Sequence, residues 1–570
     1  MPPREALKIY FGYDDFRPLQ SEIVESVLTG RDTLALMPTG GGKSICFQVP
    51  TLVMAQDNPN KRLCLVITPL IALMRDQVAN LEARNIHAAA VYTGMSWDKQ
   101  RVALDNCLYG PYHFLYCSPE RLESEEFRKR LADLPIGLIA VDEAHCISQW
   151  GYDFRPSYLK IAEVRALLPD VPVLALTATA TPETIEDIQD KLGFRAHNVL
   201  RKSFHRENLN YIVRRTDNKS EQLAHILSRV PGSAIVYVRN RKRAQELAEF
   251  LHTDYYHAGL TTKERNERQE AWTRGDTRVI VATNAFGMGI DKPDVRLVIH
   301  YDLPSHLESY YQEAGRAGRD GETAYAVLLF DPQQDPAKIR KRIVDTYPPK
   351  EFVESVYHKT MDFLQIGAGS GLGHRFALHI DQLCHVMKLP VLQTYSALHI
   401  LTQAGYIDFE EEHETQPRVQ ILVPRHQLGD YNLSREQAEL LDVLMRSYSG
   451  IYTDLQYVRE ADQISNVQSQ ISNHQILVSL AQRGIITYIP RSIGCSLTMT
   501  NERQTEIYLS PAIFEERQAR FISKIQSMLE YAEQNQFCRE QLLLAYFGET
   551  DAVACGHCDV CRSLAADAVR

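Results

Sequence analysis

A glycine-rich segment near the amino terminus has the residue types needed to hold a triphosphate. The segment MPTGGGKS, residues 37–44, follows a short apolar run and precedes residues with helical periodicity. Small glycines let backbone N–H groups turn toward phosphate oxygens, Lys43 can reach the β- and γ-phosphates, and the hydroxyl of Ser44 can bind Mg²⁺. Met37 stands where the strict motif has glycine, so a chance glycine-rich turn is the alternative. The loop residues expected to contact a nucleotide are Thr39, Gly40, Gly41, Gly42, Lys43 and Ser44.

Two adjacent carboxylates end another apolar run further along the chain. Asp142 and Glu143 follow the run LIAV and open the sequence DEAH. Because ligands bind at the carboxyl ends of the strands in an open α/β sheet, the pair is expected to lie beside the phosphate loop. There Asp142 would hold Mg²⁺, directly or through water, and Glu143 would orient and deprotonate an attacking water. A solvated acidic pair at a strand end is the alternative.

Hydrolysis of a triphosphate also needs positive charge near the developing γ-phosphoryl group. The segment QEAGRAGRDG supplies Arg316 and Arg319, which are three residues apart and therefore share one face of a helix. We predict that both act as arginine fingers, so that hydrolysis depends on closure of the two halves of the chain. Surface salt bridges are the alternative role for this pair.

Four cysteines cluster near the carboxyl terminus with the spacing C-x16-C-x2-C-x2-C. They are Cys538, Cys555, Cys558 and Cys561. Four thiolates at this spacing fit tetrahedral Zn²⁺, and a closed four-cysteine site leaves no position for water. We therefore expect a structural zinc on which folding of the tail depends. A redox CxxC pair and ligation by His557 are the alternatives. The other seven cysteines are scattered singly and are expected to be small buried hydrophobes.

The elements that must position these groups are predicted from short apolar runs. Such runs recur over residues 33–180 and again over residues 233–330, each followed by residues of helical periodicity. Runs that are apolar on both faces are typical of a parallel sheet covered by helices. The sequence therefore predicts two consecutive α/β domains that join near residues 202–210.

The texture of the sequence changes after residue 331. A glycine-rich stretch that begins at Ile366 reads as a linker. Two units then follow. The first has the order helix, turn, helix and a charged hairpin-like wing that ends in RVQILV at residues 418–423, and the second, residues 471–500, has the order helix, Gly, strand, turn and strand. We interpret both as winged helix-turn-helix units. Plain helical packing domains are the alternative.

Composition limits the classes of protein that this chain can belong to. Its 570 residues are too many for one core, and its 62 Lys and Arg against 72 Asp and Glu give a net charge of −10. This balance argues against a nonspecific polycation that coats nucleic acid or anionic lipid, although a local basic groove is compatible with it. The first sixteen residues show no basic patch followed by an apolar run, so no secretory signal is expected and the location is intracellular.

The motifs of residues 11–321 together resemble the RecQ family of superfamily 2 DNA helicases, in the order in which that family carries them. The segments are FGYDDFRPLQ, TPLIALMRDQ, SPERL, DEAH, ATAT (from Ala178), YHAGL, TNAFGMGIDKP and QEAGRAGRDG. The resemblance implies that Tyr13 stacks on the adenine base and that Arg17 and Gln20 contact nucleotide edges. The tail sequence LLAYFGET is similar to the zinc module of the same family.

An aromatic-rich segment, SQWGYDFRPSY at residues 148–158, directly follows the DEAH sequence. Trp150 and Phe154 can stack on unpaired bases, which tolerates any base sequence. Arg155 can contact phosphate or signal to the neighbouring carboxylates. With Gln149, these residues are expected to couple DNA to hydrolysis. An aromatic core cluster is the alternative.

The fold class implied by the resemblance is α/β, with two tandem RecA-like parallel-sheet domains followed by winged-helix units and a small helical zinc-binding module. The predicted domains are residues 1–205 (first RecA-like domain, ATP binding), 206–345 (second RecA-like domain), 346–428 (linker and first winged helix), 429–512 (second winged helix) and 513–570 (zinc module). In the usual layout of the family the zinc module directly follows the second lobe and a winged helix comes after it. Here the winged-helix units come first, and no helical nucleic-acid-binding domain is expected after the cysteines.

A wing hairpin normally separates the strands of a duplex in this family. The turn at residues 491–494 is the preferred candidate for this wedge. The first wing is less suitable because its acidic residues should repel phosphate. These residues are Glu410, Glu411, Glu412 and Glu414.

The resemblance implies an ATP-dependent DNA helicase of repair and recombination that moves 3′ to 5′ on single-stranded DNA and unwinds tailed or forked duplex DNA. Its cofactors would be ATP, Mg²⁺ and Zn²⁺. The alternatives are an RNA helicase, a translocase that does not unwind, and a DNA-binding regulator that uses only the winged-helix and zinc parts. The protein is expected to act as a monomer away from membranes, in the cytoplasm and at the nucleoid of a bacterium, or in the nucleus of a eukaryote.

Overall fold

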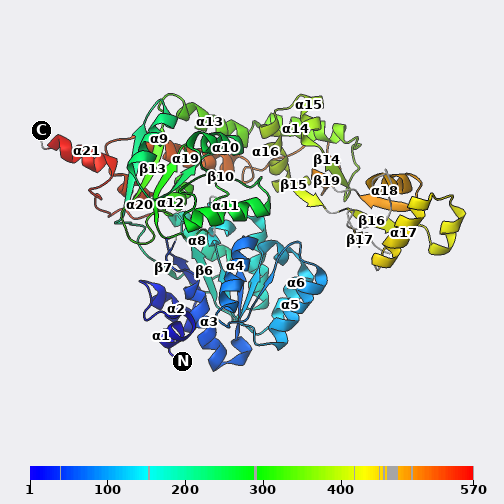
Figure 1. Cartoon of the computed structure of the whole chain (residues 1–570), viewed down its shortest axis with the longest axis horizontal. Coiled ribbons are helices and arrows are strands. Elements are labelled where there is room, and N and C mark those ends of the chain that lie inside the picture. The colour runs from blue at the N-terminus through cyan, green and yellow to red at the C-terminus, as the bar shows by residue number, and fades with distance from the viewer. Residues whose placement is uncertain are drawn as a thin grey trace. The chain divides into compact units, whose positions relative to one another are not determined.

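The computed structural model describes residues 1–38, 40–151, 154–287, 290, 292–415, 417–448, 450–452, 456–458, 473–489 and 492–568. The chain divides into two compact units (Figure 1), one formed by Met1–Arg340 with Arg520–Arg570 and the other by Lys341–Ala519. The described residues form two parallel sheets in the first unit and two small antiparallel sheets in the second.

The first lobe is built on a seven-stranded parallel sheet with the strand order β3-β4-β2-β5-β6-β1-β7. Its strands are β1 (Thr33–Leu36), β2 (Leu63–Ile67), β3 (Ala88–Val91), β4 (Phe114–Cys117), β5 (Ile136–Val141), β6 (Val173–Thr177) and β7 (Val199–Arg201). Successive residues of β2 point into two different cores, one on each face of the sheet: Leu65 packs in one and Val66 in the other. Helices thus cover both faces of the sheet, as the doubly apolar runs predict.

The helices of the first lobe connect these strands (Figure 1). They are α1 (Pro3–Ala6), α2 (Gln20–Leu28), α3 (Ile45–Asp57), α4 (Ile71–Glu82), α5 (Trp97–Tyr109), α6 (Glu125–Ala132), α7 (Ile161–Leu167) and α8 (Pro182–Lys191), with short turns η1 (Leu7–Phe11), η2 (Pro59–Lys61), η3 (Pro119–Glu123), η4 (Ala144–Ile147) and η5 (Pro156–Lys160). Polar caps fix where some of them begin: the side chain of Thr181 accepts a hydrogen bond from the backbone N–H of Thr184 at the start of α8.

The second lobe has a six-stranded parallel sheet with the order β10-β11-β9-β12-β13-β8. Its strands are β8 (Leu209–Arg215), β9 (Ser233–Tyr237), β10 (Asp254–Tyr256), β11 (Val279–Ala282), β12 (Val295–His300) and β13 (Ala324–Phe330). Its helices are α9 (Lys219–Arg229), α10 (Arg241–Leu251), α11 (Thr262–Arg274), α12 (Leu307–Ala314) and α13 (Asp335–Thr346). The two tandem parallel-sheet lobes predicted from the sequence are therefore present.

The carboxyl-terminal tail packs against the lobes within the first unit. It consists of α19 (Glu515–Glu533), which belongs to this unit from Arg520 onward, α20 (Arg539–Tyr546) and α21 (Asp559–Ala568). The ring of Phe547 lies 4.7 Å from that of Phe204, in the segment that joins the lobes, and 5.2 Å from that of Tyr311 in α12. Tyr531 of α19 lies 5.3 Å from Tyr310. Aromatic packing thus fixes the tail to the second lobe and to the interlobe segment.

The second unit contains two small antiparallel sheets, with the orders β14-β19-β15 and β17-β16-β18. Its strands are β14 (Arg375–Leu378), β15 (Ile407–Thr415), β16 (Arg418–Ile421), β17 (Gln456–Tyr457), β18 (Ile486–Ile489) and β19 (Ser492–Met499). Its helices are α14 (Lys350–Phe363), α15 (Ile380–Met387), α16 (Val391–Gln403), α17 (Arg435–Ser447) and α18 (Asn473–Gln482), with the turn η6 (Arg425–Asp430).

The strand pairing that we predicted for the two wings is wrong. The first wing was expected to end in β16, but β15 pairs with β19, with Phe409 opposite Leu497. The second wing was expected to pair β18 with β19, but β18 pairs with β16, with Tyr488 opposite Val419. The segment between β15 and β19 therefore forms a small domain with its own core, inserted between the two strands of the first wing.

This insertion changes the interpretation of both wedge candidates. Residue 491 of the preferred turn lies outside the described residues, and residues 492–494 belong to β19. In the first wing, Arg375 forms an ion pair with Glu410, and the Nε2 atom of His399 lies 2.6 Å from Glu411. Part of the acidic charge of this wing is thus paired with cationic or titratable groups of the same unit. The side chains of Glu412 and Glu414 lie outside the described residues.

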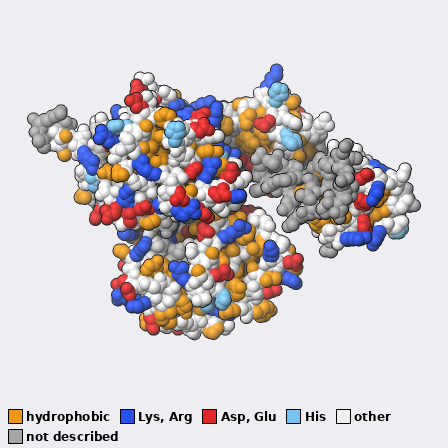
Figure 2. Space-filling view, viewed as in Figure 1, with side chains coloured by type: hydrophobic (Ala, Val, Ile, Leu, Met, Phe, Trp, Pro, Cys, Tyr) orange, Lys and Arg blue, Asp and Glu red, His pale blue; other side chains and the backbone are white. Residues whose placement is uncertain are grey.

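The surface carries both signs of charge. Figure 2 shows Lys and Arg side chains interspersed with Asp and Glu over the face in view, in keeping with the small net charge. Among the residues that the structure describes, no helix combines the length and apolar character needed to cross a bilayer.

Candidate active site and zinc centre

The glycine-rich loop after β1 has a conformation that requires glycine. Gly40 and Gly42 have φ angles of +81° and +76°, in the left-handed region. The guanidinium of Arg17 donates a hydrogen bond to the carbonyl of Gly40 (2.8 Å), and the amide of Gln20 donates to those of Gly42 (3.0 Å) and Gly41 (3.3 Å). The structure thus places Arg17 and Gln20, which were expected on the nucleotide, against the carbonyls of the loop.

The loop leads into α3, and Ser44 is the N-cap residue of this helix. The hydroxyl of Ser44 accepts a hydrogen bond from the side-chain amide of Gln77 in α4 (3.2 Å). The ring of Tyr13 is 51% exposed, so it is accessible to a planar group. Thr39 lies outside the described residues.

Lys43 and the acidic pair meet at the carboxyl edge of the first sheet. The ammonium of Lys43 lies 3.6 Å from Glu143, and both side chains are mostly buried. Asp142 accepts a hydrogen bond from the backbone N–H of Glu143 (3.0 Å) and lies within 3.5 Å of the hydroxyl of Thr68. Burial raises the pKa of the Asp142 carboxyl to about 6, while Lys43 opposes the shift and Glu143 adds to it. The carboxylate of Asp142 and the hydroxyl of Ser44 are hard oxygen donors, which fit Mg²⁺.

Glu143 has a strained backbone and a defined partner. Its φ angle is +47°, a conformation that costs a residue other than glycine about 1–3 kcal/mol. The ring of the buried His145 lies 3.4 Å from the Glu143 carboxylate and 3.0 Å from the hydroxyl of Thr177, at the end of β6. Thr177 directly precedes the segment ATAT, residues 178–181. The acidic pair is therefore connected, through His145, to the neighbouring strand.

Arg319 of the second lobe lies against the phosphate loop of the first. A methyl group on Gly40 would be 3.3 Å from the Cδ atom of Arg319, so the two segments approach each other closely. The guanidinium of Arg319 donates to the carbonyl of Ile290 (2.7 Å). Between the lobes there is a cavity of ≈ 340 Å³. It is lined by Arg17, Pro18, Met37, Pro38, Gly40, Gly41, Lys202, Arg206, Asn208, Gly318, Arg319, Asp320 and Gly321.

Arg316 occupies a different place from Arg319. Its side chain is only 4% exposed and lies beside Gly287, where an added methyl group would be 3.0 Å from Nη2. Burial raises the pKa of the neighbouring Tyr237, and the charge of Arg316 partly opposes this shift. Of the two predicted fingers, the structure thus brings only Arg319 to the phosphate loop.

The aromatic-rich segment is held by the carboxyl-terminal tail. The guanidinium carbon of Arg520 lies 4.0 Å from the centre of the Trp150 ring, which is 40% exposed. Lys524 donates to the carbonyl of Trp150 (2.7 Å) and forms an ion pair with the buried Glu308 of α12 (2.9 Å). Helix α19 therefore contacts both lobes at the point where the aromatic-rich segment begins.

The remaining residues of this segment lie close to the first lobe. The ammonium of Lys191 in α8 lies 6.0 Å from the centre of the Phe154 ring. The backbone N–H of Arg155 donates to the carbonyl of Cys146 (2.8 Å). Gln149 is half-buried, and residues 152 and 153 lie outside the described residues.

The four tail cysteines form one cluster. Their sulfur atoms all lie within 4.8 Å of one another, and those of Cys538 and Cys558 are 4.0 Å apart. Tetrahedral Zn–S bonds of about 2.3 Å place sulfurs about 3.8 Å apart, so the cluster fits Zn²⁺. The backbone N–H of Cys555 donates to the sulfur of Cys538 (3.3 Å), which favours a thiolate. One oxygen of Glu540 and one ring nitrogen of His557 lie within 4.8 Å of Cys555.

The other seven cysteines are buried, as expected for small hydrophobic residues. They are Cys46, Cys64, Cys107, Cys117, Cys146, Cys384 and Cys495.

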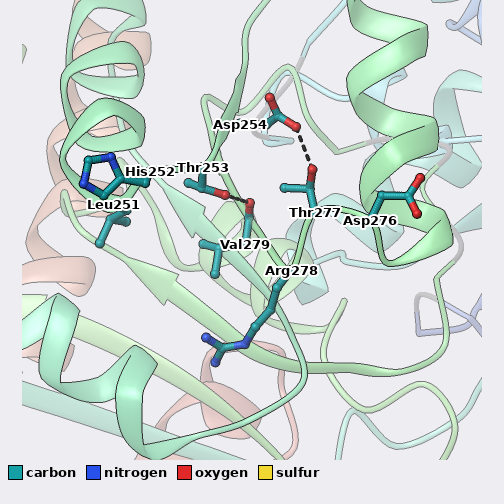
Figure 3. Close-up of a pocket in the computed structure, with 8 residues that line it drawn as sticks. All are labelled: Leu251, His252, Thr253, Asp254, Asp276, Thr277, Arg278 and Val279. Carbon is teal, nitrogen blue, oxygen red and sulfur yellow. Dashed lines mark hydrogen bonds between the residues drawn. The ribbon is translucent and has the colours of Figure 1, made fainter.

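Figure 3 shows a larger cavity in the second lobe, which none of these groups lines. It has a volume of ≈ 530 Å³ and sits at the amino ends of β10 and β11. In it the hydroxyl of Thr277 donates to the carboxylate of Asp254 (2.7 Å). Ligands of open α/β sheets bind at the opposite, carboxyl edge, so volume alone does not mark the site. The lining residues are Leu251, His252, Thr253, Asp254, Asp276, Thr277, Arg278 and Val279.

Two parallel-sheet lobes with a phosphate loop, a DEAH sequence and an arginine from the second lobe define the core of a superfamily 2 helicase. The sequence matches the family models DEAD/DEAH box helicase at residues 17–188 and Helicase conserved C-terminal domain at residues 218–321. It also matches RecQ helicase winged-helix domain, Bacteroidota, at residues 419–490, and RecQ zinc-binding at residues 501–562. The chain belongs to the RecQ helicase family. The placement of winged-helix sequence before the zinc module is confirmed.

Similar proteins from Bacillus subtilis support the assignment to the RecQ family. The ATP-dependent DNA helicase RecQ of Bacillus subtilis is 45% identical over 332 residues, which cover 57% of this chain and 55% of that protein. The probable ATP-dependent DNA helicase RecS of Bacillus subtilis is 40% identical over 338 residues, 58% of this chain and 67% of that protein. The chain spans about half the length of the RecQ relatives that it matches.

Among solved structures, the DUF1998 helicase MrfA bound to DNA has a similar fold. The TM-score is 0.51 at 19% identity, over 60% of this chain and 50% of that one. At this identity the similarity concerns the fold alone.

Sequence reasoning missed several residues that the structure places at these sites. Gln77 lies in the motif TPLIALMRDQ, for which no contact with the phosphate loop was predicted, yet its amide donates to Ser44. Arg206 lines the interlobe cavity but belongs to no motif. Arg520 and Lys524 are separated from Trp150 by more than 300 residues, so no local pattern signals their contact. The YHAGL and TNAFGMGIDKP motifs lie in the second lobe, which also carries Arg319.

Proposed function

We propose that this protein is an ATP-dependent DNA helicase that moves 3′ to 5′ along single-stranded DNA and unwinds tailed or forked duplex DNA. One observation supports it above all others: Arg319 of the second lobe lies against Gly40 in the phosphate loop of the first, beside a cavity that both lobes line. A triphosphate in this cavity would touch both lobes at once. Its hydrolysis would then change the contact between them, which is how fuel use can drive movement.

The proposed chemistry assigns a role to each polar group at the carboxyl edge of the first sheet. Lys43 neutralises the β- and γ-phosphates, and Arg319 stabilises charge that develops on the transferred phosphoryl group. Glu143 orients the attacking water and accepts its proton. Asp142 and Ser44 would hold Mg²⁺, which supplies positive charge between the phosphate oxygens.

Glu143 lies 3.6 Å from Lys43 in the structure. Bound phosphate would compete with Glu143 for the ammonium of Lys43, and so free the carboxylate to act as a base. The proposed nucleotide contacts further include Tyr13, Arg17, Gln20 and residues 39–42. Arg316 is proposed to stabilise the conformation of its own segment, because its side chain is buried beside Gly287.

DNA is proposed to contact the aromatic-rich segment through Trp150 and Phe154, with Gln149 and Arg155 passing the signal to the acidic pair. The 45% identical relative is called an ATP-dependent DNA helicase, which favours DNA over RNA as the substrate. We further propose that the protein acts as a monomer in DNA repair and recombination, in the cytoplasm of a bacterium. The domain boundaries predicted from the sequence are retained as part of this proposal, with an inserted domain between β15 and β19 as the one change.

The test is ATP-driven strand displacement on 3′-tailed and 5′-tailed DNA duplexes and on a matched 3′-tailed RNA duplex. The wild-type protein should displace strands only from the 3′-tailed DNA. Lys43→Ala should abolish DNA-stimulated ATP hydrolysis and strand displacement while it retains DNA binding. Lys129→Ala is the matched control, because that lysine contacts Glu125 on the exposed side of α6. Turnover retained by Lys43→Ala, or displacement of RNA alone, contradicts the proposal.

A further inference from the structure

The zinc module binds the segment that joins the two lobes through a buried carboxylate. Glu540 lies in the first turn of α20, two residues after the zinc-cluster residue Cys538, and is only 2% exposed. Its Oε1 atom accepts hydrogen bonds from the backbone N–H of Arg206 (2.9 Å) and from the Nδ1 atom of His205 (2.9 Å). Glu540 also lies beside the cysteine cluster, since an oxygen of its carboxylate is within 4.8 Å of the Cys555 sulfur.

The side chain of Arg206 holds the turn that carries Arg316 and Arg319. Its Nη2 atom donates to the carbonyls of Ala317 (3.0 Å) and Gly318 (3.0 Å), and Nη1 lies 3.5 Å from the carbonyl of Gly315. Gly318 has a φ angle of +63°, and Asn208 also donates to its carbonyl (2.7 Å). The forked guanidinium thus fixes several carbonyls of this turn in one geometry.

The next residue of the turn is Arg319, whose side chain lies close to Gly40 in the phosphate loop. A continuous series of contacts therefore runs from the cysteine cluster through Glu540 and Arg206 to Arg319. Each of these contacts is a packed or hydrogen-bonded pair of the first unit, and the first of them involves a fully buried carboxylate.

We propose that Glu540 is a positioning residue, through which the zinc module orders the turn of Arg319 for ATP hydrolysis. This inference rests on the proposed function, and it deepens it by giving the zinc module a part in the hydrolytic step. The module would act by fixing the backbone of Arg206, whose side chain in turn fixes residues 315–318.

The expected effect on hydrolysis follows from the sensitivity of such sites to position. A displacement of about 1 Å can cost ~100-fold in rate, and an arginine finger contributes ~10³ to 10⁵. Glu540→Ala removes both hydrogen bonds to the interlobe segment, so we expect kcat for DNA-stimulated hydrolysis to fall about 10- to 100-fold. The KM for ATP should change little, because the phosphate loop is untouched. Glu540→Gln keeps an oxygen acceptor and should stay within about 3-fold of the wild type.

The test compares the full-length wild type with Glu540→Ala, Glu540→Gln and the matched control Glu549→Ala. Glu549 also binds the interlobe segment from the zinc module, at Ser203 and Phe204, but neither of these binds the turn of Arg319. For each protein, zinc content, kcat and KM for ATP, and hydrogen–deuterium exchange of residues 313–322 are measured. We expect Glu540→Ala alone to lose kcat and to exchange faster over residues 313–322, with zinc retained.

Several results would overturn the inference. Glu540→Ala with full zinc content, wild-type kcat and unchanged exchange over residues 313–322 contradicts it. If Glu540→Ala loses zinc or fails to fold, Arg206→Lys decides the question: it keeps the backbone N–H and the charge but loses the fork. Arg206→Lys should lose kcat with zinc retained, and a wild-type kcat for it would refute the inference. If the wild type itself hydrolyses no ATP, the proposed function fails, whereas the exchange experiment still tests the link from Glu540.

Discussion

Arg520 covers the ring that is proposed to stack on DNA bases. Its guanidinium carbon lies 4.0 Å from the centre of the Trp150 ring, so a base that stacks there must displace Arg520. A cation–π contact at a partly exposed site is worth about 0.5–1 kcal/mol. Because every 1.4 kcal/mol is tenfold in affinity, Arg520→Gln should tighten binding of single-stranded DNA about 2- to 5-fold.

The assay is fluorescence anisotropy of a labelled single-stranded oligonucleotide at several salt concentrations. Loss of the Arg520 charge weakens long-range attraction to phosphate, and this contribution falls as salt rises. The tightening should therefore be clearest at high salt. Trp150→Ala supplies the matched background: it should weaken binding by about 1–3 kcal/mol, and in that background Arg520→Gln should no longer tighten it.

Two outcomes separate a cover from a DNA contact. If Arg520→Gln weakens binding by the same factor with and without Trp150, Arg520 itself binds DNA and the reasoning is refuted. Tightening that depends on Trp150 supports intramolecular competition for the ring.

Two further predictions concern the tail and the cysteines. Lys524→Met leaves the buried carboxylate of Glu308 without its ammonium partner, so the free energy of unfolding should fall by about 3–5 kcal/mol, and the midpoint of urea unfolding should fall with it. Adding Glu308→Gln should restore part of this free energy, and no recovery in the double variant contradicts the prediction. Burial raises the pKa values of Cys46, Cys64 and Cys107 to about 12, so these thiols stay neutral and unreactive from pH 7 to 9. A zinc chelator should therefore expose four further thiols, those of the tail cluster, to an alkylating reagent. If the chelator exposes none, the zinc site is contradicted.

The parts of the site that the sequence predicts well are those made by neighbours in the chain. Glycines with positive φ at residues 40 and 42, the acidic pair at the end of β5 and the closely spaced cysteines each depend on a few consecutive residues. The parallel order of the strands then brings separate motifs to one edge of the sheet, which explains why Lys43 and Glu143 meet.

The wings show where this reasoning fails. The first wing was expected as a charged hairpin and the second as two strands joined by a turn, so the partner of each strand was assigned by closeness in sequence. The true partner of β15 is β19, beyond an inserted domain, because the apolar faces of both strands complete the core that includes Phe409 and Leu497. A period-2 pattern specifies a face of a strand but not its neighbour, so only tertiary packing decides such a pairing.

The two arginines show a similar limit. Arg316 and Arg319 are equivalent by spacing, but the turn at Gly318 separates them: Arg319 lies on the phosphate loop and Arg316 is buried beside Gly287. Contacts made by Arg206 and by the tail residues Arg520 and Lys524 join segments that are far apart in the chain, and no local signal announces them.

The central claim is that both lobes share one catalytic site, and Arg319 provides its most direct test. Single-turnover ATP hydrolysis is measured with saturating single-stranded DNA for the wild type, Arg319→Ala and Arg319→Lys, with nucleotide affinity measured separately. We expect both variants to bind ATP nearly as well as the wild type, and Arg319→Ala to hydrolyse it ~10³-fold or more slowly. Hydrolysis by Arg319→Ala at the wild-type rate would contradict the shared site and, with it, the coupling of ATP to movement.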